Sequence, residues 1–165
     1  MINKLHAAMI ELYGGDAPRI QHFCKVHSYA KLIAELENMD ADTLFILETA
    51  ALTHDIGIHY CEEKFGDCNG KLQEQYGPDI AKRLLADLQF PEQVSRRVQY
   101  LIAHHHTYEN IDGMDYQILV EADFLVNLYE DGLSDQAIEH AYQKIFKTDA
   151  GKKICREMFR LAEGM

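Results

Sequence analysis

Residues 42–56 limit most strongly how this chain can fold, because they form a predicted helix that is apolar on most of its sides. Such a helix has to be buried all round, so other elements must surround it. At its end stand His54 and Asp55, followed by the helix-stopping Gly57. The two side chains point about 100° apart and cannot chelate as an i, i+4 pair. At a helix end, however, both can reach one ion that is also held by other helices.

The rest of the chain also carries apolar residues at helical spacing, and no run alternates as a half-buried strand would. Residues 57–76 are turn-rich, and we expect an irregular lid or binding loop there. A chain of 165 residues fits one domain. The sequence therefore predicts an all-α, single-domain bundle of about seven to eight helices over residues 1–165. The expected helices cover residues 2–12, 18–37, 42–56, 77–88, 91–103, 116–129, 134–146 and 150–162.

Composition narrows the possible partners. The formal net charge of −11 opposes binding to a nucleic-acid backbone, which requires clustered lysine and arginine. A small phosphorylated substrate stays compatible, because a bound cation reverses the local charge. No apolar stretch approaches the ~20 residues of a membrane span, so no membrane partner is expected. The four cysteines show no C-x-x-C spacing and no signal peptide is recognisable, which favours a reduced, cytoplasmic setting. Assembly into a homo-oligomer stays open.

Four polar residues, His22, His54, Asp55 and Asp123, lie in or next to apolar helical stripes. A buried carboxylate costs several kcal/mol unless it is paired, hydrogen-bonded or bound to a metal. Taken alone, His22 is more often a satisfied core histidine, and Asp123 could pair with a helix end or a loop. Together, two imidazoles and two carboxylates suit a divalent ion such as Mn, Fe, Co, Ni, Zn or Mg.

In chain order, His22, the His54-Asp55 pair and Asp123 resemble the signature of the HD-domain superfamily of metal-dependent phosphohydrolases. The resemblance covers about residues 18–130. It implies an all-α fold, one divalent metal ion held by these four residues, and hydrolysis of a phosphoester by a metal-activated water. The segments that carry it are Arg19-Ile20-Gln21-His22, Ala50 through Gly57, Ile80-Ala81 through Leu85, Ile102-Ala103-His104-His105 and Glu121-Ala122-Asp123.

The same resemblance places His104 and His105 beside the metal pocket. We expect them to act in catalysis, by moving protons or stabilising developing charge near neutral pH. The competing interpretation is a solvent-exposed histidine cluster after a helix C-terminus, where the helix dipole favours cationic side chains.

Two departures from the family pattern affect the predicted substrate contacts. Ile58 stands where many members have lysine, so another residue must bind phosphate; Arg19, Lys64 and Lys71 are the candidates, although each could be a solvated surface charge. The second departure is the absence of any histidine between positions 59 and 104. A second ion would need Glu74 or a water in that place. We therefore expect one ion, and count Glu74 with Arg19 and Lys71 as candidate substrate-binding residues.

The resemblance favours hydrolysis of a small phosphorylated molecule, with a nucleotide as the expected substrate. Two alternatives stay open. One is an HD-type oxygenase with a di-iron site, which the missing histidine disfavours. The other is a non-catalytic module that binds a nucleotide or a metal.

Overall fold

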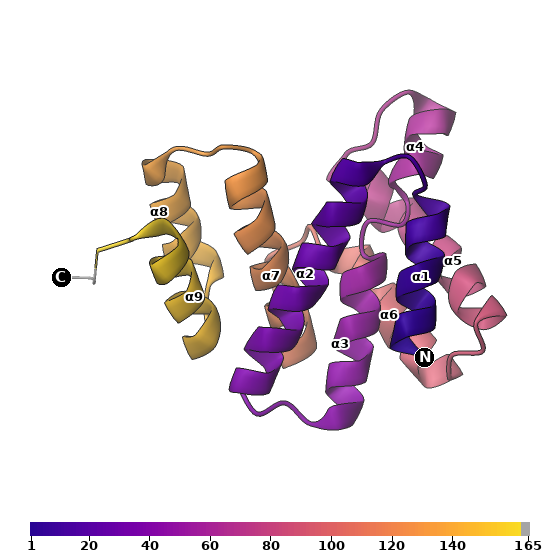
Figure 1. Cartoon of the computed structure of the whole chain (residues 1–165), viewed down its shortest axis with the longest axis horizontal. Helices are drawn as coiled ribbons and strands as arrows, with labels where there is room; N and C mark the ends of the chain where they lie inside the picture. Colours follow the sequence, from indigo (N-terminus) through magenta and orange to yellow (C-terminus); the bar gives the residue numbers. More distant parts are fainter. Residues whose placement is uncertain (163–165) are drawn as a thin grey trace.

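The computed structural model describes residues 1–162 and consists of helices joined by short connections (Figure 1). Within these residues there are nine helices and no strand, so the prediction of an all-α helical bundle is confirmed. The helices are α1 (Ile2–Leu12), α2 (Ala17–Leu36), α3 (Ala41–Thr53), α4 (Ile58–Phe65), α5 (Gly70–Asp87), α6 (Glu92–His104), α7 (Met114–Glu130), α8 (Asp135–Ile145) and α9 (Asp149–Phe159).

Helix α3 has the central position that its apolar pattern predicts. It contacts α1, α2, α6 and α7, and all its residues from Leu47 to Thr53 are buried. The side chain of Asp40 caps its first turn by accepting the N–H of Thr43 at 2.9 Å. The regular helix ends at Thr53, earlier than predicted, because residues 54–57 form a turn that leads directly into α4.

Helices α2 and α7 pack against each other and against α3, and Figure 1 shows them at the middle of the molecule. Asp16 caps α2 by accepting the N–H of Arg19 at 3.3 Å, and Pro18 stands in the first turn, where its missing N–H leaves no helical bond unmade. His22 and Asp123 lie among the buried residues of these two helices. The packing of α2, α3 and α7 therefore brings both side chains to the end of α3.

The prediction of an irregular loop over residues 57–76 is wrong. The segment contains α4 and the start of α5, and only Gly57 and residues 66–69 lie outside helices. Gly66, with a φ of 77°, ends α4 in the left-handed region. Asn69 explains the early start of α5, because its side chain accepts the N–H of Leu72 at 3.0 Å. The helix continues through Pro78, which we had expected at its beginning.

The turn after α3 meets α5 at a pair of glycines. A Cβ on Gly57 would lie 3.2 Å from Cα of Gly77, and a Cβ on Gly77 would lie 2.8 Å from Cγ2 of Ile102. Glycine suits position 57 because the backbone of α5 approaches it closely, and position 77 because the side chain of Ile102 fills the space of a Cβ. The contact holds the turn with His54 and Asp55 against α5, and α5 against α6.

At the other end of the molecule, α8 and α9 attach to α7 (Figure 1). Glu121 of α7 is fully buried, and its Oε1 accepts the N–H groups of Lys147 and Thr148 at 2.6 and 2.9 Å. Gln117 donates to the same oxygen at 2.7 Å. These bonds tie the α8–α9 connection to the helix that carries Asp123. In residues 1–162, none of the helices is both long and apolar enough to cross a membrane.

Candidate metal centre

The turn that follows α3 directs His54 and Asp55 into the interior. His54 is fully buried, and its Nδ1 donates to the carbonyl of Ala51 in the last turn of α3 at 2.8 Å. The hydroxyl of Tyr13, directly after α1, donates to the carbonyl oxygen of Asp55 at 2.7 Å. The two bonds satisfy carbonyl groups that a helix end leaves free, and they set the direction of the turn.

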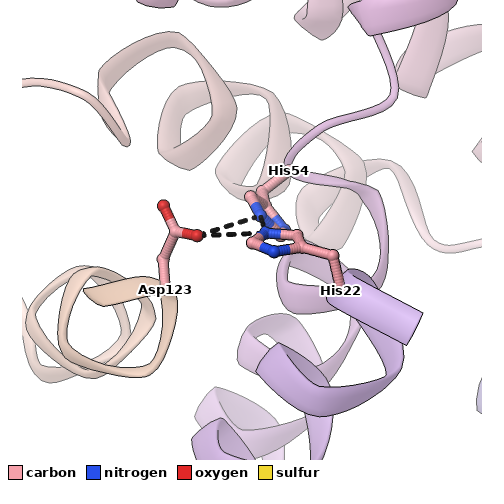
Figure 2. A group of neighbouring side chains, drawn as sticks. All are labelled: His22, His54 and Asp123. Carbon is pink, nitrogen blue, oxygen red and sulfur yellow. Dashed lines mark hydrogen bonds and ion pairs between the residues drawn. The ribbon is translucent and has the colours of Figure 1, made fainter. Parts of the chain in front are cut away.

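Four ligand atoms converge at this point, from α2, from α7 and from the turn after α3. Figure 2 shows three of the residues, His22, His54 and Asp123. Nε2 of His22 lies 3.3 Å from Nε2 of His54 and 3.2 Å from Oδ1 of Asp123. Oδ2 of Asp55 lies 3.3 Å from Nε2 of His22 and 3.4 Å from Nε2 of His54. The structure thus brings together all four residues predicted as metal ligands.

The hydrogen atoms on the rings of His22 and His54 determine whether this cluster can accept a cation. Nδ1 of His54 faces a carbonyl, and Nδ1 of His22 faces the carboxylate of Glu130 at 3.0 Å. Both partners only accept hydrogen bonds, so both Nδ1 atoms carry hydrogen. In neutral rings, the two Nε2 atoms then point lone pairs at each other and at two carboxylates. That arrangement requires a proton or a cation between them, so the donor set fits a metal ion.

The charges of the protein alone also favour a cation here. Burial lowers the pKa of His54, but the carboxylates of Asp55 and Asp123 outweigh it and raise the pKa well above its usual value. Burial raises the pKa of Asp55, yet the charges of its histidine neighbours, His54 first, hold that pKa well below its usual value. The pKa of Asp123 is lowered too, because hydrogen bonds from His22 and His54 outweigh its burial. Both carboxylates are therefore ionised at neutral pH and attract positive charge.

Asp55 also faces a second group, at the C-terminal end of α6. Its Oδ1 lies 3.6 Å from Nε2 of His105, and ligand atoms of Asp55, His105 and His106 lie within 4.8 Å of one another. His105 is buried and donates its Nδ1 to the carbonyl of Ile102 at 2.7 Å, which leaves Nε2 toward the centre. The side-chain amide of Gln73 lies 3.3 Å from His105 and 3.0 Å from His106. Asp55 thus belongs to two possible ligand groups. One contains His22, His54 and Asp123, and the other contains His105 and His106.

A pocket of about 260 Å³ opens onto these residues. Its wall includes Arg19 from α2, Gln73 from α5, His106 after α6, and Asn127 and Glu130 from α7. Burial, reinforced by the charge of His105, lowers the pKa of His106 to about 4, so this ring is neutral at pH 7. A larger surface hollow of about 560 Å³ lies along α8 and contains none of the candidate metal ligands. We therefore take the smaller pocket as the candidate substrate site.

The three predicted substrate-binding residues have different surroundings. Arg19 lines the pocket and donates two hydrogen bonds to Glu62, at 3.0 and 2.5 Å. Lys71 is exposed on α5 and is not among the residues of the pocket wall. Glu74 accepts the N–H of His106 at 3.0 Å and the hydroxyl of Thr107 at 2.9 Å, so it holds the turn after α6. Only Arg19 is in a position to touch a ligand in the pocket.

The histidine triplet divides into one residue outside the centre and two at it. His104 donates its Nδ1 to the carbonyl of Tyr100 at 2.7 Å and stacks on that ring, with the centroids 4.2 Å apart. It belongs to neither ligand group. His105 and His106 do belong to one, so the structure brings the predicted catalytic residue His105 to the centre but not His104.

The residues predicted for the site did not include Gln73, Asn127 or Glu130. Asn127 donates to Oδ1 of Asp123 at 2.9 Å, and Glu130 accepts from His22. Their spacing from Asp123 could have identified Asn127 and Glu130 in the sequence, because residues four and seven positions further along a helix lie on the same face. Gln73 carried no such signal, since its segment was predicted to be irregular.

The chain is thus an all-α bundle with a candidate metal centre. A His-Asp pair follows its central helix, and a histidine and an aspartate from two flanking helices complete the cluster. The family model for the HD domain matches residues 19–157, which is more than half of the chain. The chain belongs to the HD domain family, and the resemblance seen in the sequence is confirmed.

A search of solved structures supports the same assignment. The chain is similar to the crystal structure of a predicted HD superfamily hydrolase from an uncultured Thermotogales bacterium, with a TM-score of 0.69 and 25% sequence identity. The match covers 96% of this chain and 84% of that one. No curated protein matched.

Proposed function

We propose that this protein hydrolyses a phosphoester of a small molecule, with a nucleotide as the expected substrate, at a centre that holds one divalent metal ion. The observation that carries the proposal is the convergence of His22, His54, Asp55 and Asp123 beside a pocket. Membership of the HD domain family and the structural similarity to an HD superfamily hydrolase support the class of reaction.

His22, His54, Asp55 and Asp123 would hold the ion, and their mixed nitrogen and oxygen donors suit Mn, Fe, Co, Ni, Zn or Mg. When bound, the ion supplies Lewis-acid chemistry, which polarises a phosphoryl oxygen and lowers the pKa of a water molecule. The ion also makes the pocket acceptable to an anion, because the two ionised carboxylates alone would repel a phosphate.

Arg19 is the proposed partner of the substrate phosphate. A guanidinium can hold phosphate through two parallel hydrogen bonds, the same fork that Arg19 offers to Glu62. The side chains of Arg19 and Glu62 are 34% and 40% exposed, so solvent screens their attraction and a phosphate can compete for the arginine. In this proposal, Arg19 supplies the phosphate contact that Ile58 cannot make.

His105 and His106 are the proposed proton-handling and positioning residues on the opposite wall. The hydrogen bond from Nδ1 of His105 to Ile102 leaves its Nε2 free to hold or release a proton at the centre. His106 is neutral at pH 7 and can serve as an uncharged hydrogen-bond partner of the substrate. His104 has no part in the proposal, since its ring lies against Tyr100.

A screen of phosphomonoesters and phosphodiesters, including nucleoside mono-, di- and triphosphates, tests the proposal. Protein stripped with EDTA should lose activity and regain it with at least one of Mn, Co or Ni. His54→Ala and Asp55→Ala should lose both bound metal and activity. His140→Ala, which removes an exposed histidine of α8, is the matched control and should retain both. Full metal content and activity in His54→Ala would refute the proposal.

The group formed by Asp55, His105 and His106 favours a second candidate, an oxygen-dependent enzyme with two irons. The missing histidine between residues 59 and 104 disfavours two ions, but His106 offers a ligand in its place. Metal analysis separates the two candidates. One ion per chain and no oxygen uptake support the hydrolase, whereas two irons per chain with iron-dependent oxygen uptake support the alternative.

A further inference from the structure

The ring of His22 has a partner on each side. Its Nε2 faces His54 and Asp123, while its Nδ1 donates to Oε2 of Glu130 at 3.0 Å. We propose that Glu130 is a positioning residue, which sets the tautomer and the orientation of His22 for metal binding. The inference rests on the metal centre of the proposed function, but it requires neither the proposed substrate nor the proposed reaction.

The first support comes from the register of α7. Asp123, Asn127 and Glu130 are spaced four and three residues apart, so they follow one face of the helix, and all three line the pocket. Asp123 reaches the cluster directly, Asn127 donates to Asp123 at 2.9 Å, and Glu130 reaches back to the ring of His22. A single helix face therefore provides one ligand of the centre and the hydrogen-bond partners of two ligands.

The second support is the way the carboxylate of Glu130 is held. Its Oε1 lies 2.7 Å from Nζ of Lys25, and its Oε2 accepts from His22. Lys25 and His22 are three residues apart on α2, so both oxygens of Glu130 are engaged by neighbouring positions of one helix. This bridge leaves the carboxylate little freedom to turn away from the imidazole.

The bond from Glu130 lies at the edge of the buried centre. The side chain of His22 is only 9% exposed and that of Glu130 is 27% exposed, so Glu130 stands between Nδ1 of His22 and solvent. An imidazole that donates to a carboxylate is a stronger metal ligand, and its Nε2 is kept free of hydrogen. Loss of such a partner typically lowers metal affinity by about 10- to 100-fold.

Metal titration of the stripped full-length protein tests the inference. We would measure the dissociation constant for Co²⁺ and Zn²⁺ against a competing chelator in the wild type, Glu130→Ala, Glu130→Gln and Asp131→Asn. Glu130→Ala should bind both ions about 10- to 100-fold more weakly. Glu130→Gln keeps an acceptor oxygen without the charge and should recover part of that loss. Asp131→Asn removes a negative charge from the adjacent exposed residue and should bind as the wild type does.

Nitrogen-15 NMR of the His22 ring distinguishes a positioning role of Glu130 from a purely structural one. The Zn²⁺-loaded wild type should show metal on Nε2 and a hydrogen on Nδ1 that is hydrogen-bonded to Glu130. In Glu130→Ala, the Nδ1 hydrogen should lose the downfield shift and the slow exchange that the bond to a carboxylate gives it. Wild-type affinity and an unchanged ring spectrum in Glu130→Ala would overturn the inference, as would equal losses in Glu130→Ala and Asp131→Asn. If Glu130→Ala does not fold, the Glu130→Gln affinity and the wild-type spectrum decide.

A wild type that binds metal but hydrolyses no phosphoester would refute the proposed function and leave this inference standing.

Discussion

Glu62 accepts two hydrogen bonds from the guanidinium of Arg19, at 3.0 and 2.5 Å, and so joins α4 to α2 at the edge of the candidate pocket. Both side chains are partly exposed, and a pair of this kind contributes about 1 kcal/mol or less. Glu62 thus occupies the N–H donors of Arg19 that would bind the substrate phosphate. A phosphate must displace Glu62 before it can bind Arg19, which makes the pair a point of competition between protein and substrate.

Glu62→Gln should therefore bind substrate more tightly than the wild type. Loss of the competing charge should lower KM by up to ~5-fold, which corresponds to ~1 kcal/mol, with little change in kcat. Steady-state kinetics on the best substrate of the phosphoester screen measures this. Glu63→Gln, at the exposed neighbouring position, is the control for the loss of one negative charge. An unchanged or higher KM in Glu62→Gln would show that Glu62 does not compete with the substrate for Arg19.

Metal should stabilise the folded protein, because the unfolded chain lacks the preformed ligand cluster. At an ion concentration of 100 times Kd, the gain is ~2.7 kcal/mol, or about 5–10 °C in Tm for a chain of this size. Thermal unfolding of the stripped protein, with and without added Mn²⁺ or Zn²⁺, measures the shift. His54→Ala should lose most of it, whereas His140→Ala should show the full shift. Equal shifts in the two variants would place the bound metal elsewhere.

Asp16 predicts a small pH-dependent contribution to stability. The hydrogen bond from His59, reinforced by Arg19, holds the pKa of Asp16 below its usual value of 3.8 in the folded state. A lowered carboxyl pKa stabilises the fold above about pH 4, and the contribution is lost as the pH falls through the lowered pKa. Asp16→Asn keeps the helix cap but loses the charge, so we expect it to be less stable than the wild type at pH 6, by less than ~1 kcal/mol.

Urea unfolding at pH 6 and pH 3 checks this expectation for Asp16. The difference between Asp16→Asn and the wild type should shrink at the lower pH. Asp131→Asn controls for the loss of one exposed negative charge. A difference that grows toward pH 3 would contradict the expected sign.

Gly77→Ala should destabilise the protein although alanine is the better helix former. The new Cβ would lie 2.8 Å from Cγ2 of Ile102, so either that side chain or α5 must shift. Overpacking of this kind costs about 1–3 kcal/mol, more than the ~0.5–1 kcal/mol that alanine contributes within a helix. Chemical denaturation measures the change in the free energy of unfolding.

A double-mutant cycle with Ile102→Ala identifies the cause of that loss. Removal of the isoleucine side chain makes room for the new Cβ, so the two substitutions together should cost less than the sum of their separate effects. Strict additivity would show that the contact between Gly77 and Ile102 is not the source of the strain.

Several features could be predicted from the sequence because their causes are local. The cap at Asp16 and the apolar surroundings of residues 42–56 follow from hydrogen-bonding groups and helical spacing within a few positions. The segment after Gly57 could not be predicted in this way. Its glycines and polar residues indicate a loop, yet Asn69 caps α5 and the close contact of Gly57 with Gly77 holds the two segments together.

By itself, the sequence determined that the chain is helical and that His22, His54, Asp55 and Asp123 are costly to bury without a shared partner. Only the tertiary structure decided which other side chains meet them. The packing of α6 turns His105 toward Asp55 and leaves His104 on Tyr100, although the two histidines are adjacent in sequence. Likewise, Glu130 meets His22 across 108 residues because α2 packs against α7. Helical spacing tells which residues share a face, but the partner of that face depends on contacts between distant segments.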